Sequence, residues 1–160
     1  MEIKGLKQWL IWKMKDGRKV PLNKWGQSSG VDRPADFMTY DEAKDIYEKR
    51  NVDGVAFVFT EGDGFFGVDL DNSVSRVTKK TKTFKPWAEE ILNAASSYSE
   101  ISPSLKGLKI FCKGKLPDDC RHRFDIDDGQ MEIYEAGRFF TFTEMFIPGF
   151  GKQINEFDPA

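Results

Sequence analysis

The stretch NVDGVAFVFTEGDGFFGVDLDN, residues 51–72, contains two apolar runs separated by four polar or glycine residues. Both runs, 54–60 and 65–71, are short and rich in Val and Phe, which is typical of buried β-strands. The segment EGDG between them contains two glycines and predicts a turn. We therefore expect a β-hairpin at the centre of the fold.

The second run carries two aspartates within an otherwise apolar pattern. Side chains alternate between the two faces of a strand, so Val68 and Leu70 should point into the core. Asp69 and Asp71 should then share the other face, about 7 Å apart. Two neighbouring carboxylates repel each other unless a cation lies between them, and Mg²⁺ prefers oxygen ligands. The alternative is an ordinary pair of acidic residues at a solvent-facing strand end.

A third carboxylate occurs in QMEIYEAGRFFTFT, residues 130–143. Met131 and Ile133 alternate with Glu132, so a neighbouring strand in the same sheet would bring Glu132 beside the aspartates. Alternatively, Glu132 is an exposed strand residue paired with a lysine. Arg138 begins the next expected strand and is suited to bidentate binding of phosphate oxygens, or it pairs with Glu135 across the turn.

The segment SEISPSLKGLKIF, residues 99–111, places a serine- and lysine-bearing turn between two expected strands. Its backbone N–H groups, the Ser104 hydroxyl and the ammonium groups of Lys106 and Lys109 could bind a triphosphate. The GxxxxGK[ST] order of a Walker loop is absent. The alternative is an ordinary turn that contains lysines.

Strands and helices alternate along the rest of the chain. The pattern predicts strands at 8–14, 98–102, 108–113, 131–135 and 138–143, and a loop at 115–130. Thr39 and Glu42 form a capping-box signature for a helix over 39–51, and Pro86 fits the first turn of a second helix. The result is an α/β (α+β) fold with a mixed, mostly antiparallel sheet and flanking helices.

Composition sets the class of protein. With 160 residues, 39% hydrophobic and 31% charged, the chain suits one compact domain, which we place at 1–147, with 148–160 as a tail or the start of a linker. Apolar runs are too short for a membrane helix, and the N-terminus lacks the apolar segment of a signal peptide, so we expect a cytoplasmic protein with no membrane partner. Cys112, Cys120 and His122 suggest part of a zinc site, but a fourth ligand and CxxC spacing are missing.

The net charge is −2, but the basic residues are unevenly distributed. Residues 1–24 contain seven Lys or Arg and two acidic residues, and residues 72–87 contain five Lys or Arg and no acidic residue. We expect such segments to contact the phosphates of a nucleic acid, or else to be solvated loops. The candidate nucleic-acid-binding residues are Lys24, Lys79, Lys80 and Lys82.

The chain resembles the primase-polymerase (prim-pol) N-terminal domain of phage and plasmid replication proteins, within the archaeo-eukaryotic primase superfamily. The resemblance rests on three motifs in the same order: FGVDLDN, SEISPSLKGLKIF and MEIYEAGRFFTFT. The likeness also includes QWLIWKMKDGRKVPLN, which is similar to the family's opening strand and polar turn. It further includes NVDGVAFVFTEGDGFFGVDLD, which is similar to the family's central hairpin, so the likeness covers roughly residues 8–143.

This resemblance implies a DNA primase and DNA polymerase core that transfers nucleotides from dNTPs or NTPs, directed by a template. The implied partners are a single-stranded DNA template, a primer, and a helicase domain or another replication partner. By position in the motifs, Asp69, Asp71 and Glu132 would be catalytic and bind Mg²⁺ or Mn²⁺. The implied nucleotide-binding residues are Ser104, Lys106, Lys109 and Arg138.

Three positions depart from the family pattern. The second motif usually reads S-x-S-G-K-G-L-H, but this chain has Leu105 at the first glycine and Lys109 at the histidine, and Glu144 stands where a glycine is common. Lys109 can bind a phosphate but supplies no imidazole. Leu105 lacks the conformational freedom of glycine. Three alternatives therefore stay open: a catalytically degenerate domain that binds nucleic acid or nucleotide, a metal-dependent nuclease or other phosphotransferase, and a structural module.

Overall fold

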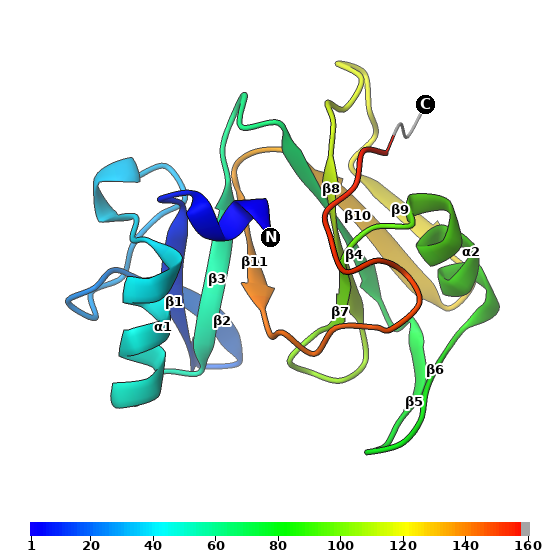
Figure 1. The fold of residues 1–160 in the computed structure, drawn as a ribbon, viewed down its shortest axis with the longest axis horizontal. Coiled ribbons are helices and arrows are strands. Elements are labelled where there is room, and N and C mark those ends of the chain that lie inside the picture. Colours follow the sequence, from blue (N-terminus) through cyan, green and yellow to red (C-terminus); the bar gives the residue numbers. More distant parts are fainter. Residues whose placement is uncertain (158–160) are drawn as a thin grey trace. The chain divides into compact units, whose positions relative to one another are not determined.

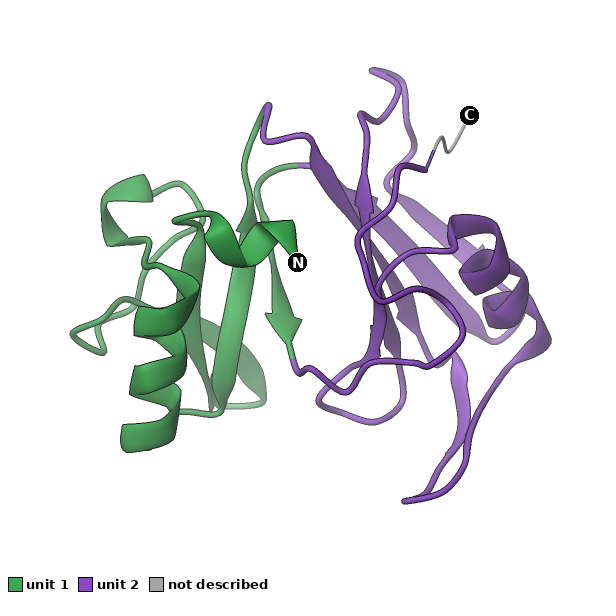
Figure 2. Cartoon of the chain, viewed as in Figure 1, with its two compact units in different colours: residues 1–61, 136–142 green, residues 62–135, 143–160 purple. Residues whose placement is uncertain are grey.

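The computed structural model describes residues 1–157 and contains, within that range, eleven strands and two α-helices. The chain forms two compact units (Figure 2): unit 1 comprises residues 1–61 and 136–142, and unit 2 comprises residues 62–135 and 143–160. The chain therefore passes into unit 2 after Glu61, returns to unit 1 after Glu135 and leaves it again after Phe142. The predicted α+β class with a mostly antiparallel arrangement is confirmed.

Unit 1 is a four-stranded antiparallel sheet in the order β11-β3-β1-β2, with α1 packed against β1 and β3 (Figure 1). Its elements are β1 (Trp9–Lys15), β2 (Arg18–Leu22), α1 (Tyr40–Lys49), β3 (Gly54–Phe59) and β11 (Arg138–Phe142), with short 3₁₀ helices at Glu2–Gly5 and Pro34–Asp36. The start of α1 is fixed by the predicted capping box, because the Thr39 hydroxyl accepts from the Glu42 N–H and the Glu42 carboxylate accepts from the Thr39 N–H.

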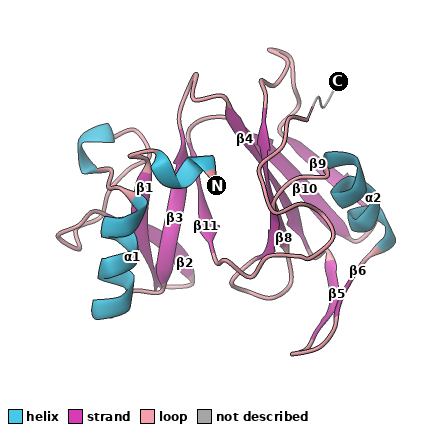
Figure 3. Cartoon of the chain, in the orientation of Figure 1, coloured by secondary structure: helices cyan, strands magenta, loops and turns pink. Residues whose placement is uncertain are grey.

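Unit 2 is a five-stranded antiparallel sheet in the order β7-β8-β4-β10-β9, accompanied by α2 and a two-stranded ribbon of β5 and β6 (Figure 3). Its elements are β4 (Phe65–Asp71), β5 (Val74–Val77), β6 (Lys82–Phe84), α2 (Pro86–Ala95), β7 (Ser99–Ile101), β8 (Leu108–Lys113), β9 (Arg123–Ile126) and β10 (Gly129–Tyr134).

The core of unit 2 lies between its sheet and α2. Val68 and Leu70 of β4 are buried in one apolar cluster with Trp87 and Leu92 of α2. Asp69, between them in sequence, is half-buried on the opposite face of the strand. Packing against α2 therefore determines which face of β4 carries the aspartates, as the alternation predicts.

The predicted hairpin of residues 54–71 is wrong. β3 pairs with β1 and β11 in unit 1, whereas β4 pairs with β8 and β10 in unit 2. Both strands are central in their sheets, so each already has a hydrogen-bonded neighbour on both edges and neither has an edge for the other. The EGDG turn still forms, with Gly62 and Gly64 at positive φ, but it connects the two units.

Two expected loops also contain more structure than the sequence predicts. The expected loop 115–130 contains β9, and the basic segment 72–85 contains β5 and β6. These strands have only three or four residues each, at or below the shortest run over which alternation predicts a strand.

Residues 148–157, which we expected to be a tail or linker, belong to unit 2 and contact its strand β8. Ile154 is buried. The backbone N–H of Lys113 in β8 donates to the Asn155 carbonyl, and the backbone carbonyl of Lys113 accepts from the Phe157 N–H. The short strand β7 pairs only with Leu108–Ile110, so it leaves the end of β8 with unpaired backbone groups that residues 155–157 satisfy.

Neither α-helix of the described residues is long and apolar enough to span a membrane. Cys112 is buried and Cys120 is half-buried, and both are free thiols.

Candidate active site

Five charged residues form a row across all five strands of the unit 2 sheet. The strand register pairs Asp69 directly with Glu132 of β10 and with Lys109 of β8. It also pairs Glu132 with Arg123 of β9, and Lys109 with Glu100 of β7. Directly opposed residues of antiparallel strands point to the same face, so these side chains share the face away from α2. We call Arg123, Glu132, Asp69, Lys109 and Glu100 the charged row.

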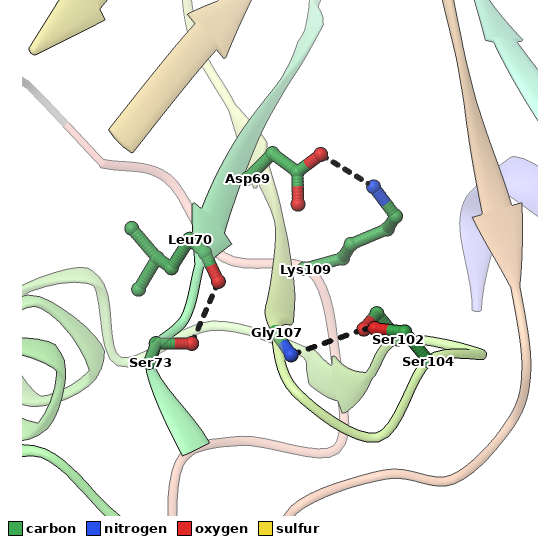
Figure 4. Close-up of polar contacts among 7 residues, drawn as sticks. All are labelled: Asp69, Leu70, Ser73, Ser102, Ser104, Gly107 and Lys109. Atoms are coloured by element: carbon green, nitrogen blue, oxygen red, sulfur yellow. Dashed lines mark hydrogen bonds and ion pairs between the residues drawn. The ribbon is translucent and has the colours of Figure 1, made fainter. Parts of the chain in front are cut away.

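The closest ion pair in the row joins Lys109 and Asp69 (Figure 4). Lys109 Nζ donates to Asp69 Oδ2 over 2.7 Å. The lysine side chain is 6% exposed and the aspartate side chain 21%. Lys109 thus neutralises the carboxylate that the sequence marks as the first candidate metal ligand.

Glu132 lies as the sequence predicts, on a neighbouring strand and directly opposite Asp69. The side chain is 26% exposed, and its Oε1 is 3.8 Å from Nη1 of the exposed Arg123. At this distance Glu132 and Arg123 form a loose ion pair. The partner is thus an arginine, whereas the sequence suggested a lysine. Because the arginine is exposed, the pair contributes little to stability.

Asp71 lies two residues beyond Asp69 on the same face of β4, is exposed, and pairs in register with Gln130. Asp69, Asp71 and Glu132 are therefore a set of oxygen donors on adjacent strands, which by donor type and placement suits a hard divalent cation. Within residues 1–157, however, no three His, Cys, Asp or Glu side chains converge into a metal-binding group. That statement also covers Cys112, Cys120 and His122.

The turn at 102–107 lies at the same end of the sheet as Asp71. Ser102 Oγ contacts Ser104 Oγ at 3.0 Å and accepts from the Gly107 N–H at 3.2 Å (Figure 4). A side chain at Gly107 would come within 2.9 Å of the Leu70 carbonyl oxygen, so only glycine lets the turn approach β4 this closely. Ser104 and Lys106 are exposed at this turn.

Two further contacts hold the turn against the end of β4. The N–H groups of Ser73 and Val74 both donate to the Lys106 carbonyl, at 3.0 and 3.1 Å. Leu105 adopts a positive φ of 61°, a region that glycine occupies readily. The turn therefore keeps the glycine-like conformation at Leu105 at a cost in backbone strain.

Glu100 is a buried member of the row to which the sequence analysis assigned no role. Its carboxylate accepts from the Thr143 N–H at 2.7 Å, the Tyr98 hydroxyl at 2.9 Å and the Glu144 N–H at 3.1 Å. Burial raises its pKa to about 7 although these hydrogen bonds favour the charged form. The signal in the sequence is that Tyr98, just before β7, and Ile101, at its end, fall on opposite faces of the extended chain, which indicates a strand buried on both sides.

The other predicted site residues lie elsewhere in the fold. Arg138 begins β11 of unit 1, opposite Phe59, and Lys24 is exposed in unit 1 with its Nζ 4.7 Å from the Trp25 ring centroid. Lys79 and Lys80 are exposed at the end of the β5–β6 ribbon of unit 2. Lys82 Nζ donates to the carbonyl oxygen of Phe146 at 3.0 Å.

No protein-family model matches the chain. The chain is similar to the DNA primase-polymerase of Nitratiruptor phage NrS-1, with 37% identity over 157 residues, which is 93% of this chain and 21% of the relative. The chain thus spans about a fifth of the length of that relative. This similarity confirms the resemblance to primase-polymerases that the order of the motifs predicts.

Proposed function

We propose that this chain is the catalytic core of a DNA primase-polymerase and transfers nucleotides from dNTPs or NTPs to a growing strand directed by a template. The observation that carries the proposal is the direct pairing of Glu132 with Asp69, on the face that also carries Asp71. The similarity to a phage primase-polymerase supports the reaction class. A phage or plasmid replication system, with a helicase domain or another replication protein as partner, stays a prediction.

In this proposal Asp69, Asp71 and Glu132 would hold Mg²⁺ or Mn²⁺. When bound, such ions orient the triphosphate and neutralise charge on the reacting oxygens. The chain's own contribution is placement, because two strands in fixed register, β4 and β10, keep the three carboxylates on one face.

The turn at 102–107 would bind the triphosphate of the incoming nucleotide. Its Ser104 hydroxyl and the Lys106 ammonium group are exposed and lie next to the end of β4 that carries Asp71. Both groups suit phosphate oxygens. Arg138, which lies in unit 1, stays a separate prediction of a phosphate ligand. Lys109 is proposed to contribute positive charge to the same site while it orients Asp69.

The β5–β6 ribbon and the N-terminal basic segment would contact the single-stranded template through Lys24, Lys79, Lys80 and Lys82. Exposed lysines bind the phosphates of a strand without regard to sequence, which fits a replication enzyme.

The test is extension of a labelled primer on a single-stranded template with all four dNTPs and Mn²⁺ or Mg²⁺. We compare the wild type with Asp69→Asn/Asp71→Asn, and with Asp119→Asn as an exposed acidic control. Template-dependent growth should be retained in Asp119→Asn and should fall at least about a hundredfold in the double variant, because two of the three carboxylates that would hold the metal ions are lost. Equal growth in the double variant would disprove the assignment of the two aspartates.

A second candidate function is a domain that binds nucleotide or nucleic acid without forming bonds. The observation that favours it is the ion pair of Lys109 with Asp69, because a protein cation already occupies the carboxylate. Binding of a dNTP without any extension by the wild type would support this function. Degradation of the template without added triphosphate would support the nuclease instead.

A further inference from the structure

A concave site of unit 2, apart from the charged row, lies between the β5–β6 ribbon and the segment 147–150. It is a pocket of about 480 Å³, within the range of small-molecule sites. The ribbon contributes Lys79, Lys80, Lys82 and Phe84, and the facing segment contributes Pro148 and Phe150. Figure 1 shows the ribbon extending out from the five-stranded sheet.

The charge of this pocket favours an anion. Three ammonium groups line it against the single carboxylate of Glu89. Lys82 also fastens the ribbon to the opposite wall, since its Nζ donates to the Phe146 carbonyl at 3.0 Å. Lys79 and Lys80 are exposed at the mouth, and Arg76 continues the basic series along β5. A series of cations that extends beyond the pocket matches a polyanion better than a single phosphate group.

The apolar side of the pocket is aromatic. The rings of Phe84 and Phe150 lie 6.4 Å apart at an interplanar angle of 77°. Both are half-buried and pack against the core of unit 2, so the rings are held in place. A flat aromatic ligand can contact one such ring, and base–aromatic stacking is independent of base identity.

We propose that this pocket binds one unpaired nucleotide of single-stranded DNA, with its base against Phe150 and its flanking phosphates at Lys79 and Lys80. The lysines and the aromatic walls together match a ligand that carries negative charge along its length and flat rings at intervals, as a nucleic-acid strand does. The identity of the strand as a template rests on the proposed function, but the binding site itself does not.

The test compares two fluorescent probes of equal length and charge: an oligothymidylate and an oligomer of abasic sites. The wild type should bind the oligothymidylate at least about fivefold more tightly, the lower end of the stacking contribution of one base. Phe150→Ala and Phe150→Leu should both lose that preference and leave affinity for the abasic oligomer unchanged. The leucine variant keeps apolar volume in the pocket, and Tyr47→Leu is the control for loss of an aromatic ring elsewhere.

The phosphate contacts are tested by salt dependence. Lys79→Ala/Lys80→Ala should reduce the slope of log affinity against log salt by about 1.4 for both probes, which corresponds to two phosphate contacts. Lys49→Ala/Lys115→Ala removes two exposed lysines elsewhere in the chain and should leave the slope unchanged.

Each outcome separates this site from the proposed function. Three results would refute the proposal that this pocket binds a nucleotide of a single strand. They are equal affinity of the wild type for the two probes, no binding of either probe, and an unchanged preference in both Phe150 variants. If the pocket bound a free dNTP more tightly than the oligothymidylate, and Phe150→Leu lost that binding, a single strand would not be its ligand. Absence of primer extension with the base preference intact would refute the polymerase while leaving the pocket established.

Discussion

Lys109 donates a hydrogen bond from its buried ammonium group to Asp69 over 2.7 Å, between two residues that are direct partners across β8 and β4. Both backbone positions are fixed by the sheet register, so the ion pair is built into the fold. Any divalent cation that binds Asp69 must therefore share that carboxylate with Lys109 or displace it.

Replacing Lys109 with Met should destabilise the metal-free protein and strengthen its response to metal. The variant leaves the Asp69 carboxylate half-buried without its cation, at an expected cost of about 2 kcal/mol, between the values for exposed and buried pairs. Thermal unfolding should then shift down by about 4–8 °C. Added Mn²⁺ should raise the unfolding temperature more in Lys109→Met than in the wild type, because no lysine competes for Asp69.

The control is Lys115→Met, which removes an exposed lysine paired with Asp118. Its unfolding temperature and its response to Mn²⁺ should equal those of the wild type. An equal Mn²⁺ response in Lys109→Met and the wild type would show that Lys109 does not compete with metal.

Glu100 should make the protein less stable as the pH rises toward neutrality. Burial raises the pKa of Glu100 from 4.5 to about 7 in the folded protein, so between these values the folded state binds more protons than the unfolded state. The stabilisation is complete below about pH 4.5 and is lost as the pH rises through about 7, with a total change of about 3 kcal/mol.

Urea unfolding at pH 5 and pH 8 checks this prediction. Glu100→Gln should lose that part of the pH dependence, and it should be less stable than the wild type at pH 5, because its amide NH₂ cannot accept the hydrogen bond that a backbone N–H now donates. Glu90→Gln, on the exposed face of α2, should keep the wild-type pH dependence. Parallel pH profiles for Glu100→Gln and the wild type would contradict the prediction.

Replacing Leu105 with Gly should stabilise the turn at 102–107. Leu105 holds φ at 61° and is 47% exposed, so its side chain gains little from packing. Relief of about 1–2 kcal/mol of left-handed strain offsets the entropy cost of glycine, about 0.5–1 kcal/mol, and leaves a gain of up to about 1.5 kcal/mol. Chemical denaturation measures the gain, and Leu105→Ala, which keeps the strain, should show none. A glycine variant less stable than the alanine variant would refute the strain.

Replacing Gly129 with Ala should disturb the strand that carries Glu132. A methyl group at Gly129 would collide with the Trp87 ring and lie 2.7 Å from the Asp71 carbonyl oxygen. Overpacking of this kind costs about 1–3 kcal/mol, which thermal unfolding will detect. Gly5→Ala is the matched control, because a methyl group there meets no atom within 4 Å. Equal unfolding temperatures for the two variants would show that β10 accommodates the added methyl group.

Local signals in the sequence predicted single elements well, but not which strands pair. The capping box of Thr39 and Glu42 correctly places the start of α1, and the expected strand 108–113 matches β8. The hairpin failed because two buried apolar runs joined by a glycine-rich turn fit equally well as neighbours or as central strands of separate sheets. Partner choice depends on the whole set of edges available, which no local pattern contains.

For the candidate site, alternation was sufficient to place Glu132 opposite Asp69 once both strands were known. It could not reveal that Lys109 neutralises Asp69, because that contact depends on the register between β4 and β8. From its place in a turn motif, Lys109 is instead predicted to bind a phosphate. Glu100 was missed for a related reason, since its burial comes from residues 143 and 144, far away in the sequence.

The interrupted order of the two units has a consequence for biosynthesis. Strand β11, which completes the sheet of unit 1, is translated only after the whole of residues 62–135, so a nascent chain exposes one edge of β3 during that time. An open edge beside a buried apolar strand invites pairing with other chains. Translation through Phe142 therefore provides the strand that covers this edge, and no single cut in the gene yields either unit intact.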